Sequence, residues 1–238
     1  MKKGIQFLTL LIILISCVND TDNIEINQNQ DYIYQYSSKN GLLNNDYIGD
    51  LTIEAIKRNG EFGLGTFNMV DGGMVIFDGN VYQVLTTGEI NNITSEALSP
   101  FVLTKFFNSD TSFSLPNNIS LDSAQTLISE VVENLDLPLA IKMEGTFKTL
   151  LCRSVQKVTD ESVTLEEIIA DQTKFNFSNI EGTVIGFWYP QYFDGVNFPG
   201  FHLHVLLDDL SGGGHLLDCT FESVIVEIDY ASGVDVAL

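Results

Sequence analysis

The segment 198-FPGFHLHVLLDDLSGGGHLLDC-219 contains all three histidines of the 238-residue chain, His202, His204 and His215. Two apolar runs separated by DDLSGGG predict two β-strands joined by a turn. Side chains two residues apart lie on the same face of a strand, so we expect His202 and His204 side by side. An antiparallel return of the chain brings His215 opposite this pair. The segment therefore predicts a hairpin with three imidazoles on one face.

Three imidazoles without a nearby cysteine or fourth histidine are typical of a metal site with coordination positions left open for substrate or water. Structural zinc sites usually close with four ligands, so the pattern favours a catalytic or binding centre. The alternative is that all three are packed or surface strand histidines that hold no metal. A single His-x-His pair would not separate the two interpretations, and both stay open on the residues alone.

Strand signals dominate the rest of the chain. An Asp-Gly pair at residues 78–79 predicts a tight turn between strands Met74 to Phe77 and Val81 to Leu85. Short alternating apolar runs follow from Gly182, as in an antiparallel sheet. Helices are expected at residues 48–57, 121–135 and 164–171. This order predicts an α/β (α+β) fold of two domains: residues 31–180, with a mixed sheet and helices, and residues 181–238, an antiparallel β domain that carries the histidines.

The first residues, 1-MKKGIQFLTLLIILISC-17, resemble a bacterial export signal. Two lysines precede an apolar run too short to span a bilayer, and the residues up to Cys17 are similar to a lipobox. We expect residues 1–16 to be a signal peptide, Cys17 to carry a lipid anchor and residues 17–30 to form a flexible tether. An ordinary signal peptide with an incidental cysteine is the alternative. The expected location is the bacterial cell envelope, with the lipid on Cys17 as the contact with the membrane.

The composition restricts the partners. Acidic residues outnumber basic ones 32 to 11, which gives a formal net charge of −21. This charge repels phosphate backbones, so nucleic acid is not an expected partner, and a small anionic substrate requires a local cation in its site. Cys152 and Cys219 lack CxxC spacing and fit two buried thiols better than a disulfide. The sequence leaves open whether the chain forms a homodimer.

Four blocks of the sequence resemble the alpha-acetolactate decarboxylase family, in the family's order and at similar separations. They are FGLGTFNMVDGGMVIFDGNVYQV (62–84), AIKMEGTFKTLLCRSV (140–155), GTVIGFWYP (182–190) and PGFHLHVLLDDLSGGGHLLD (199–218). The resemblance implies that His202, His204 and His215 bind a catalytic zinc ion. It also implies that Arg153 contacts the substrate and that Thr66 is an active-site residue. The implied fold has two α/β domains with a sheet in each.

The activity that this resemblance implies is decarboxylation of 2-acetolactate, a 2-hydroxy-3-oxo acid, to acetoin. Zinc would take up the negative charge that develops as carbon dioxide leaves. The planar guanidinium of Arg153 would hold the substrate carboxylate by charged hydrogen bonds. A surface ion pair is the alternative role for Arg153.

Two departures from the family pattern bear on catalysis. The family usually reads LDGEL where this chain has 70-VDGGM-74, so Gly73 replaces a glutamate that is thought to act at the metal and in proton transfer. Family members also carry a C-terminal extension with a second glutamate, whereas this sequence ends at DYASGVDVAL. Four acidic residues are candidates to replace this glutamate, but ordinary roles, chiefly in turns, suit them better: Glu61, Asp71, Asp208 and Asp209. Water as the proton source then predicts slow turnover rather than none.

Two functions of different classes follow from the sequence. The first is a zinc-dependent acetolactate decarboxylase of weakened activity, favoured by Thr66, Arg153 and the three histidines. The second is a non-catalytic lipoprotein that binds zinc or a small hydroxy-oxo acid, favoured by Gly73 and the sequence end. A different three-histidine metalloenzyme, such as a cupin-like oxygenase, would need a further ligand that the sequence does not show.

Overall fold

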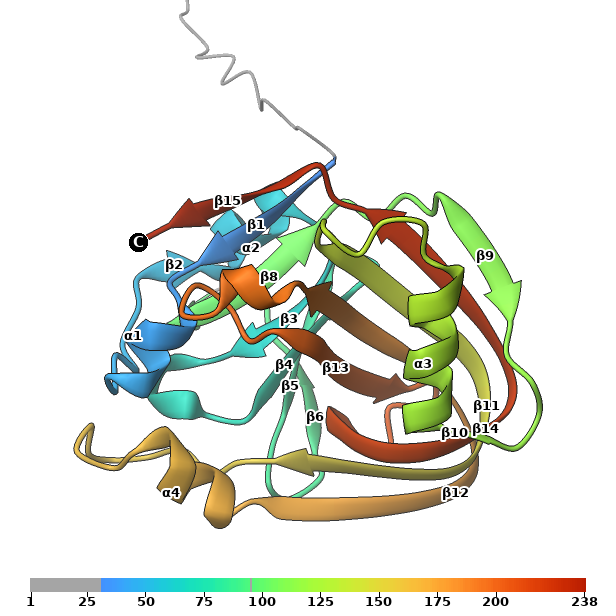
Figure 1. Ribbon diagram of the computed structural model, residues 1–238. Coiled ribbons are helices and arrows are strands. Elements are labelled where there is room, and N and C mark those ends of the chain that lie inside the picture. Colours follow the sequence, from blue (N-terminus) through green and yellow to red (C-terminus); the bar gives the residue numbers. More distant parts are fainter. Residues whose placement is uncertain (1–30, 95) are drawn as a thin grey trace, which may run out of the picture.

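The computed structural model describes residues 31–94 and 96–238, and the expected signal peptide and tether lie outside these described residues. Two β-sheets pack against each other, and helix α2 (Ile53–Asn59) covers the outer face of the first while α3 (Leu121–Val131) covers that of the second (Figure 1). The mixed α and β fold class expected from the sequence is confirmed. Within the described ranges, no helix is long and apolar enough to span a membrane.

The first sheet has seven strands, and its first and last strands along the chain pair with each other at one edge. In spatial order the strands are β15 (Gly233–Ala237), β1 (Tyr32–Tyr36), β8 (Phe101–Lys105), β3 (Phe62–Thr66), β4 (Gly73–Phe77), β5 (Asn80–Val84) and β6 (Ile90–Asn92). Strands β1 and β15 are parallel, and the other neighbours are antiparallel. The hairpin of β4 and β5 turns at Asp78 and Gly79, which both have positive φ, as the Asp-Gly pair predicts.

The second sheet is built on three long strands and one shorter one. They are β14 (Gly213–Tyr230), β11 (Leu139–Ser154), β12 (Thr173–Tyr189) and β13 (Gly200–Leu207), in that order, all antiparallel. Two short strands, β10 (Ile119–Ser120) and β9 (Thr111–Ser114), add to β14. Strand β13 also pairs with the beginning of β14, so the sheet closes on itself at one end. That closure positions the histidines.

The two sheets do not divide at the expected domain boundary between residues 180 and 181. Strands β11 and β12 belong to the second sheet, and β15 returns from the C-terminal end to the first. Strand β12 runs unbroken through residue 181, but its side chains change there from alternating exposure to continuous burial. The apolar pattern that begins at Gly182 therefore marks the part of one strand that enters the core, because a strand buried on both faces loses its alternation.

The helices begin later or end earlier than the apolar periodicity predicts. Helix α2 begins at Ile53, where the Thr52 hydroxyl accepts a hydrogen bond from the backbone N–H of Ala55. Helix α3 ends at Val131, and α4 (Leu165–Ala170) has a capping box between Thr164 and Glu167. The remaining elements are α1 (Lys39–Leu43), the paired strands β2 (Leu51–Thr52) and β7 (Leu98–Ser99), and 3₁₀ turns at Asn68–Val70 and Gln191–Phe193.

Three apolar clusters fill the layers, and their members show which way the side chains of β13 point. Leu203 and Val205 of β13 belong to the cluster beneath α3, whereas Leu206 belongs to the cluster between the two sheets. By alternation, His202 and His204 face the same way as Leu206. In the first sheet, Val75 of β4 lies in the same middle cluster. The histidines therefore point from the second sheet toward the first.

Candidate metal centre

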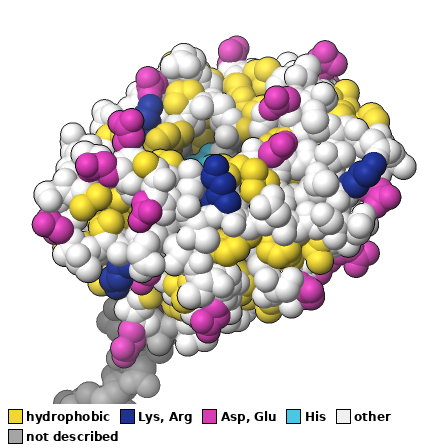
Figure 2. All heavy atoms as spheres, turned by 90° about the horizontal axis from the view of Figure 1, so that it is seen from below, with side chains coloured by type: hydrophobic (Ala, Val, Ile, Leu, Met, Phe, Trp, Pro, Cys, Tyr) yellow, Lys and Arg dark blue, Asp and Glu magenta, His cyan; other side chains and the backbone are white. Residues whose placement is uncertain are grey.

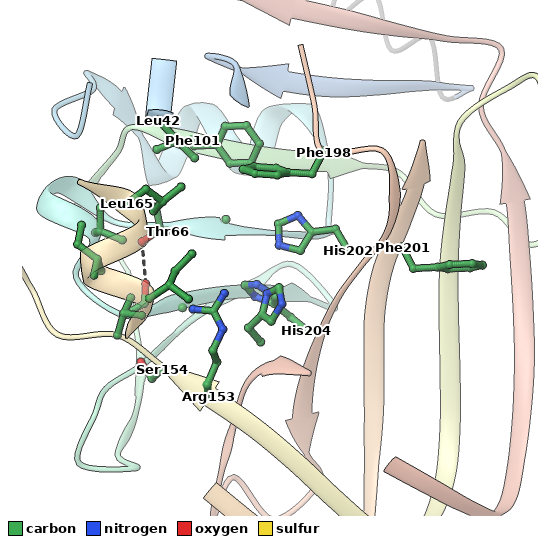
Figure 3. Close-up of a pocket in the computed structure, with 18 residues that line it drawn as sticks. Leu42, Thr66, Phe101, Arg153, Ser154, Leu165, Phe198, Phe201, His202 and His204 are labelled. Carbon is green, nitrogen blue, oxygen red and sulfur yellow. Dashed lines mark hydrogen bonds between the residues drawn. The ribbon is translucent and has the colours of Figure 1, made fainter. Parts of the chain in front are cut away.

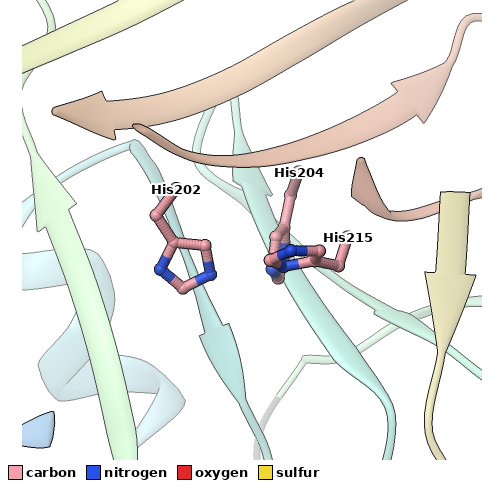
Figure 4. Close-up of side chains that lie close together, drawn as sticks. All are labelled: His202, His204 and His215. Atoms are coloured by element: carbon pink, nitrogen blue, oxygen red, sulfur yellow. The ribbon is translucent and has the colours of Figure 1, made fainter. Parts of the chain in front are cut away.

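The three imidazoles converge on one point between the sheets (Figure 4). Their candidate ligand nitrogens all lie within 4.8 Å of one another, and no other group of histidine, cysteine or acidic side chains in the described residues converges in this way. His204 and His215 are cross-strand partners in the pairing of β13 with β14, and His202 lies two residues before His204 on the same face. The convergence expected from the sequence is observed.

The closure of the second sheet explains why His215 reaches the other two. His215 pairs with His204 of β13 on one side and with Arg153 of β11 on the other. The preceding residue, Gly214, has φ of 121°, and a Cβ there would lie 2.3 Å from the carbonyl oxygen of Arg153. A side chain at position 214 would push β11 and β14 apart, so glycine is required for this close approach.

His204 is held by the first sheet. Its Nδ1 lies 2.8 Å from the carbonyl oxygen of Met74 in β4. A carbonyl oxygen only accepts hydrogen bonds, so Nδ1 carries the proton and donates it. The lone pair of Nε2 is thereby left for a metal ion, the arrangement that a second hydrogen bond gives to metal-binding histidines.

All three histidines are neutral at neutral pH. Burial, together with the smaller effect of the nearby positive charge of Arg153, lowers the pKa of His202 to about 4. Burial also lowers the pKa values of His204 and His215 well below the usual value for histidine. Metal ions bind the neutral imidazole, so the site presents three ligands that do not first need to lose a proton.

A cavity of about 350 Å³ opens beside the histidines and connects them to the surface. Figure 2 shows it as a hollow with a histidine side chain visible inside and basic and hydrophobic side chains at its rim. The wall combines residues of both sheets with α1 and α4, and is mainly apolar: Leu42, Val70, Phe101, Val155, Leu165, Ile168, Ile169 and Phe198, besides the histidines, Arg153 and Thr66. Size, apolar wall and converging polar groups suit a small organic ligand.

Arg153 lies next to the histidines at the end of β11 (Figure 3). It is partly buried in the cavity wall, and burial lowers its pKa from the usual value for arginine, although a guanidinium keeps its proton. Within the described part of the chain, the Arg153 guanidinium has no ion pair or hydrogen bond. The surface ion pair considered for it is therefore not observed, and its donors are left for an anionic ligand.

Comparison with known proteins connects this site to one family. The sequence profile of alpha-acetolactate decarboxylase matches residues 33–238 of the chain. The chain belongs to the alpha-acetolactate decarboxylase family. The enzyme of Brevibacillus brevis is 35% identical over 206 residues, which cover 87% of this chain and 72% of that protein. The enzyme of Bacillus licheniformis is 33% identical over 213 residues, covering 90% and 84% respectively.

Solved structures of this family, or similar to it, have the same fold as this chain. The alpha-acetolactate decarboxylase of Bacillus subtilis strain 168 superposes with a TM-score of 0.85 at 31% identity, covering 87% of this chain and 88% of that chain. A Staphylococcus aureus protein described as similar to alpha-acetolactate decarboxylase gives a TM-score of 0.84 at 26% identity, covering 86% and 88%. The family fold implied by the sequence blocks is thus confirmed.

Gly73 stands where the resemblance implies a glutamate. It lines the cavity, and a Cβ added there would have Cε1 of His204 as its nearest neighbour, 3.7 Å away. None of the acidic residues weighed as replacements lies in the cavity wall. Glu61 accepts from the backbone N–H of Phe107, and Asp209 from that of Ser211. Among the described residues, the cavity wall contains no carboxylate.

Thr66 lies in the cavity wall, at the end of β3, as the family resemblance implies. Its hydroxyl donates to the carbonyl oxygen of Gly72, 2.7 Å away (Figure 3). This bond uses the hydroxyl proton and fixes the turn that precedes Gly73. Thr66 therefore shapes the cavity next to the histidines, and its oxygen keeps a lone pair toward a ligand.

Two groups that orient the histidines were not predicted from the sequence. The Met74 carbonyl orients His204, and Phe198 packs its ring against His202. A backbone carbonyl has no sequence signature. Phe198 begins the histidine-containing segment 198–219, but its position before a strand is typical of an ordinary apolar residue. Cys152 and Cys219 are both buried free thiols, as predicted.

Proposed function

We propose that this protein is a zinc-dependent decarboxylase of 2-acetolactate or a closely related 2-hydroxy-3-oxo acid, working more slowly than family members that retain the glutamate. The observation that carries the proposal is one cavity that contains three converging neutral imidazoles and a guanidinium without an internal partner. Membership of the family supports the reaction.

The donor set fits zinc. Three neutral imidazoles are the ligands of open catalytic zinc sites, and His204 already has its Nδ1 proton engaged by the first sheet. The buried Nδ1 of His202 has no hydrogen-bond partner in the described chain, so no second hydrogen bond orients this ring. His202, His204 and His215 would hold the ion. When bound, zinc supplies Lewis-acid stabilisation of negative charge on the substrate oxygens.

Arg153 binds the substrate in this proposal. Its guanidinium lies beside the histidines and holds the carboxylate through paired charged hydrogen bonds. The apolar wall made by Leu165, Ile168 and Phe101 contacts the methyl groups and excludes water from the carboxylate. The bond between the carboxylate carbon and C2 then breaks, carbon dioxide leaves, and the electron pair stays on the substrate.

Protonation is the step that this chain supports least well. A proton must reach the carbon that held the carboxylate to give the hydroxy ketone. The cavity wall has no carboxylate in the described residues, so solvent water supplies this proton. A positioned general acid typically contributes about 10²–10⁴-fold to such a step, which is why we expect reduced turnover.

Two measurements on purified protein test the proposal. Metal analysis is expected to give about one zinc per chain, and acetoin should form from racemic acetolactate and disappear with a chelator. The variant His202→Ala/His204→Ala should lose zinc and acetoin formation together, because it removes two of three ligands. Glu130→Gln, an exposed change on α3, is the matched control and should keep both.

A second candidate function is a non-catalytic protein that binds zinc or a small hydroxy-oxo acid. The absence of a carboxylate from the described cavity wall favours it. Zinc binding without acetoin above the metal-free background would support this candidate and rule out the decarboxylase. A double variant that retained full zinc content would rule out both.

A further inference from the structure

Phe198 is the residue that contacts His202 from the side away from the other two histidines. It lies in the loop before β13 and lines the cavity. Its ring meets the His202 ring edge to face, with centroids 5.9 Å apart and planes at 76°. Phe101 of β8 packs against the far side of Phe198, with centroids 6.3 Å apart. Figure 3 shows Phe101 and Phe198 together above His202.

His202 differs from His204 in how its ring is held. His204 donates its Nδ1 proton to the Met74 carbonyl, whereas Nδ1 of His202 is buried and has no hydrogen-bond partner in the described chain. Metal-binding histidines usually fix their orientation through that second nitrogen. The His202 ring is instead enclosed by rings: His204 at 5.3 Å, His215 at 5.1 Å and Phe198 at 5.9 Å between centroids.

Phe198 is itself firmly placed. Its backbone N–H donates to Oδ1 of the buried Asn197, whose Nδ2 donates to Oε1 of the buried Gln35 in β1. Gln35 donates in turn to the Val196 carbonyl. The ammonium of Lys39 in α1 lies 5.5 Å from the centroid of the Phe198 ring, within range of a cation–π contact. The first sheet and α1 thus fix the loop that carries the ring.

We propose that Phe198 is a positioning residue of the metal centre, which holds His202 in its metal-binding orientation by aromatic packing in place of a hydrogen bond. The role rests on the metal centre of the proposed function. Removing the ring leaves two imidazoles on one side of His202 and free space on the other, so the ring can rotate out of the ligand set. A smaller apolar side chain fills less of that space and restrains rotation less.

Phe198→Leu tests the role in the full-length protein. Affinity for Co²⁺ and Zn²⁺ is measured by competition with a chelator, and the visible spectrum of the Co²⁺-loaded protein reports the ligand geometry. We expect Phe198→Leu to bind both ions about 10-fold more weakly, the lower end of the range for losing an outer partner of a metal ligand, and to change the Co²⁺ spectrum. Phe198→Tyr keeps the ring and should restore affinity and spectrum.

Phe201→Leu is the matched control. It removes a ring three residues away, at the edge of the cavity, on a side chain that shares the Leu203 face of β13 and packs against the cluster beneath α3 (Figure 3). Its metal affinity should equal that of the wild type, and its metal-free melting temperature reports the general effect of losing a ring in this region. Wild-type affinity and spectrum in Phe198→Leu, or equal losses in Phe201→Leu, would overturn the positioning role while leaving the decarboxylase in place. A wild type that binds neither ion would overturn both.

Discussion

Gly73 lies at the position where the resemblance to the family implies a glutamate. A side chain fits there: the atoms nearest to an added Cβ lie 3.7–3.9 Å away, ordinary contact distances, and they belong to His204 and Gly214. Gly73 shares the inward face of β4 with Val75, which lies in the cluster between the sheets. A glutamate at this position would therefore point toward the histidines without backbone strain.

Gly73→Glu is expected to raise acetoin formation by about 10²-fold, because it restores a carboxyl group that can pass a proton to the substrate. The measurement is turnover of acetolactate by the zinc-loaded variant and wild type. Gly73→Gln is the control, since the amide has the same shape but no acid–base function. An equal rise with glutamine would argue against proton transfer, and no acetoin from Gly73→Glu with zinc bound would argue against the enzyme.

Side-chain alternation was enough to predict how His202 and His204 face. The two-residue period of a strand is a local property of the sequence. The glycine-rich turn indicated that the chain returns and brings His215 opposite them, as observed. The roles of Arg153 and Thr66 came from the family resemblance, since neither residue has a distinctive local pattern. The contact of Met74 with His204 joins residues 130 positions apart in different sheets, and alternation within one strand carries no information about such a contact.

A buried ion pair between strands β8 and β14 joins the two sheets. Nζ of Lys105, at the end of β8, lies 2.7 Å from Oδ2 of Asp229 in β14, and the two side chains are 1% and 3% exposed. The same Asp229 oxygen accepts the backbone N–H of Asn108. Asp229 thus fixes the connection that leaves the first sheet and leads to the second.

Asp229→Asn should lower the free energy of unfolding by about 3–5 kcal/mol, because it removes the carboxylate charge that faces a buried ammonium. Urea unfolding followed by circular dichroism gives the value, with exposed Glu130→Gln as the control. Replacing both charges, in Lys105→Met/Asp229→Leu, should recover much of the loss, since it leaves no buried charge behind. A loss below about 1 kcal/mol in Asp229→Asn would show that the pair adds little to the joint.

Strand β12 runs across the expected domain boundary between residues 180 and 181. The first half of its seventeen residues is partly exposed, and the second half is buried on both faces. A change of burial within one strand and a change of domain look alike in sequence. The hairpin of β4 and β5 was predictable because its turn needs positive φ at two adjacent residues, a requirement that Asp-Gly meets locally.

In the whole molecule, the candidate metal centre lies between the two sheets. The second sheet provides the three imidazoles, and the first provides the Met74 carbonyl and the Gly73 side of the cavity. The fold class was predictable from the order of strand and helix patterns. The parallel pairing of β1 with β15 was not, because it joins the two ends of the described chain and neither strand has a pattern that names its partner.

This placement ties global stability to the protonation of the histidines. An unfolded histidine has a pKa near 6.5, whereas burial lowers the pKa of His202 to about 4 and those of His204 and His215 well below 6.5. Between these values the unfolded chain binds more protons than the native chain. The free energy of unfolding of the metal-free protein should therefore fall as the pH falls below 6.5. His202 alone accounts for about 2 kcal/mol by about pH 5, at about 1.4 kcal/mol per pKa unit.

Zinc should stabilise the native protein at neutral pH and fail to offset the loss of stability in acid. A ligand at about 100 times its dissociation constant stabilises the native state by about 2.7 kcal/mol, and protons compete with zinc for the imidazoles as the pH falls. Urea unfolding between about pH 7.5 and pH 5, with zinc or with a chelator, measures both effects in a window above most carboxylate titration. His202→Gln should flatten the metal-free slope by its share. A metal-free stability that stays constant across this range would mean that the native histidines take up protons as readily as the unfolded ones, and the closed neutral site described here would not exist in solution.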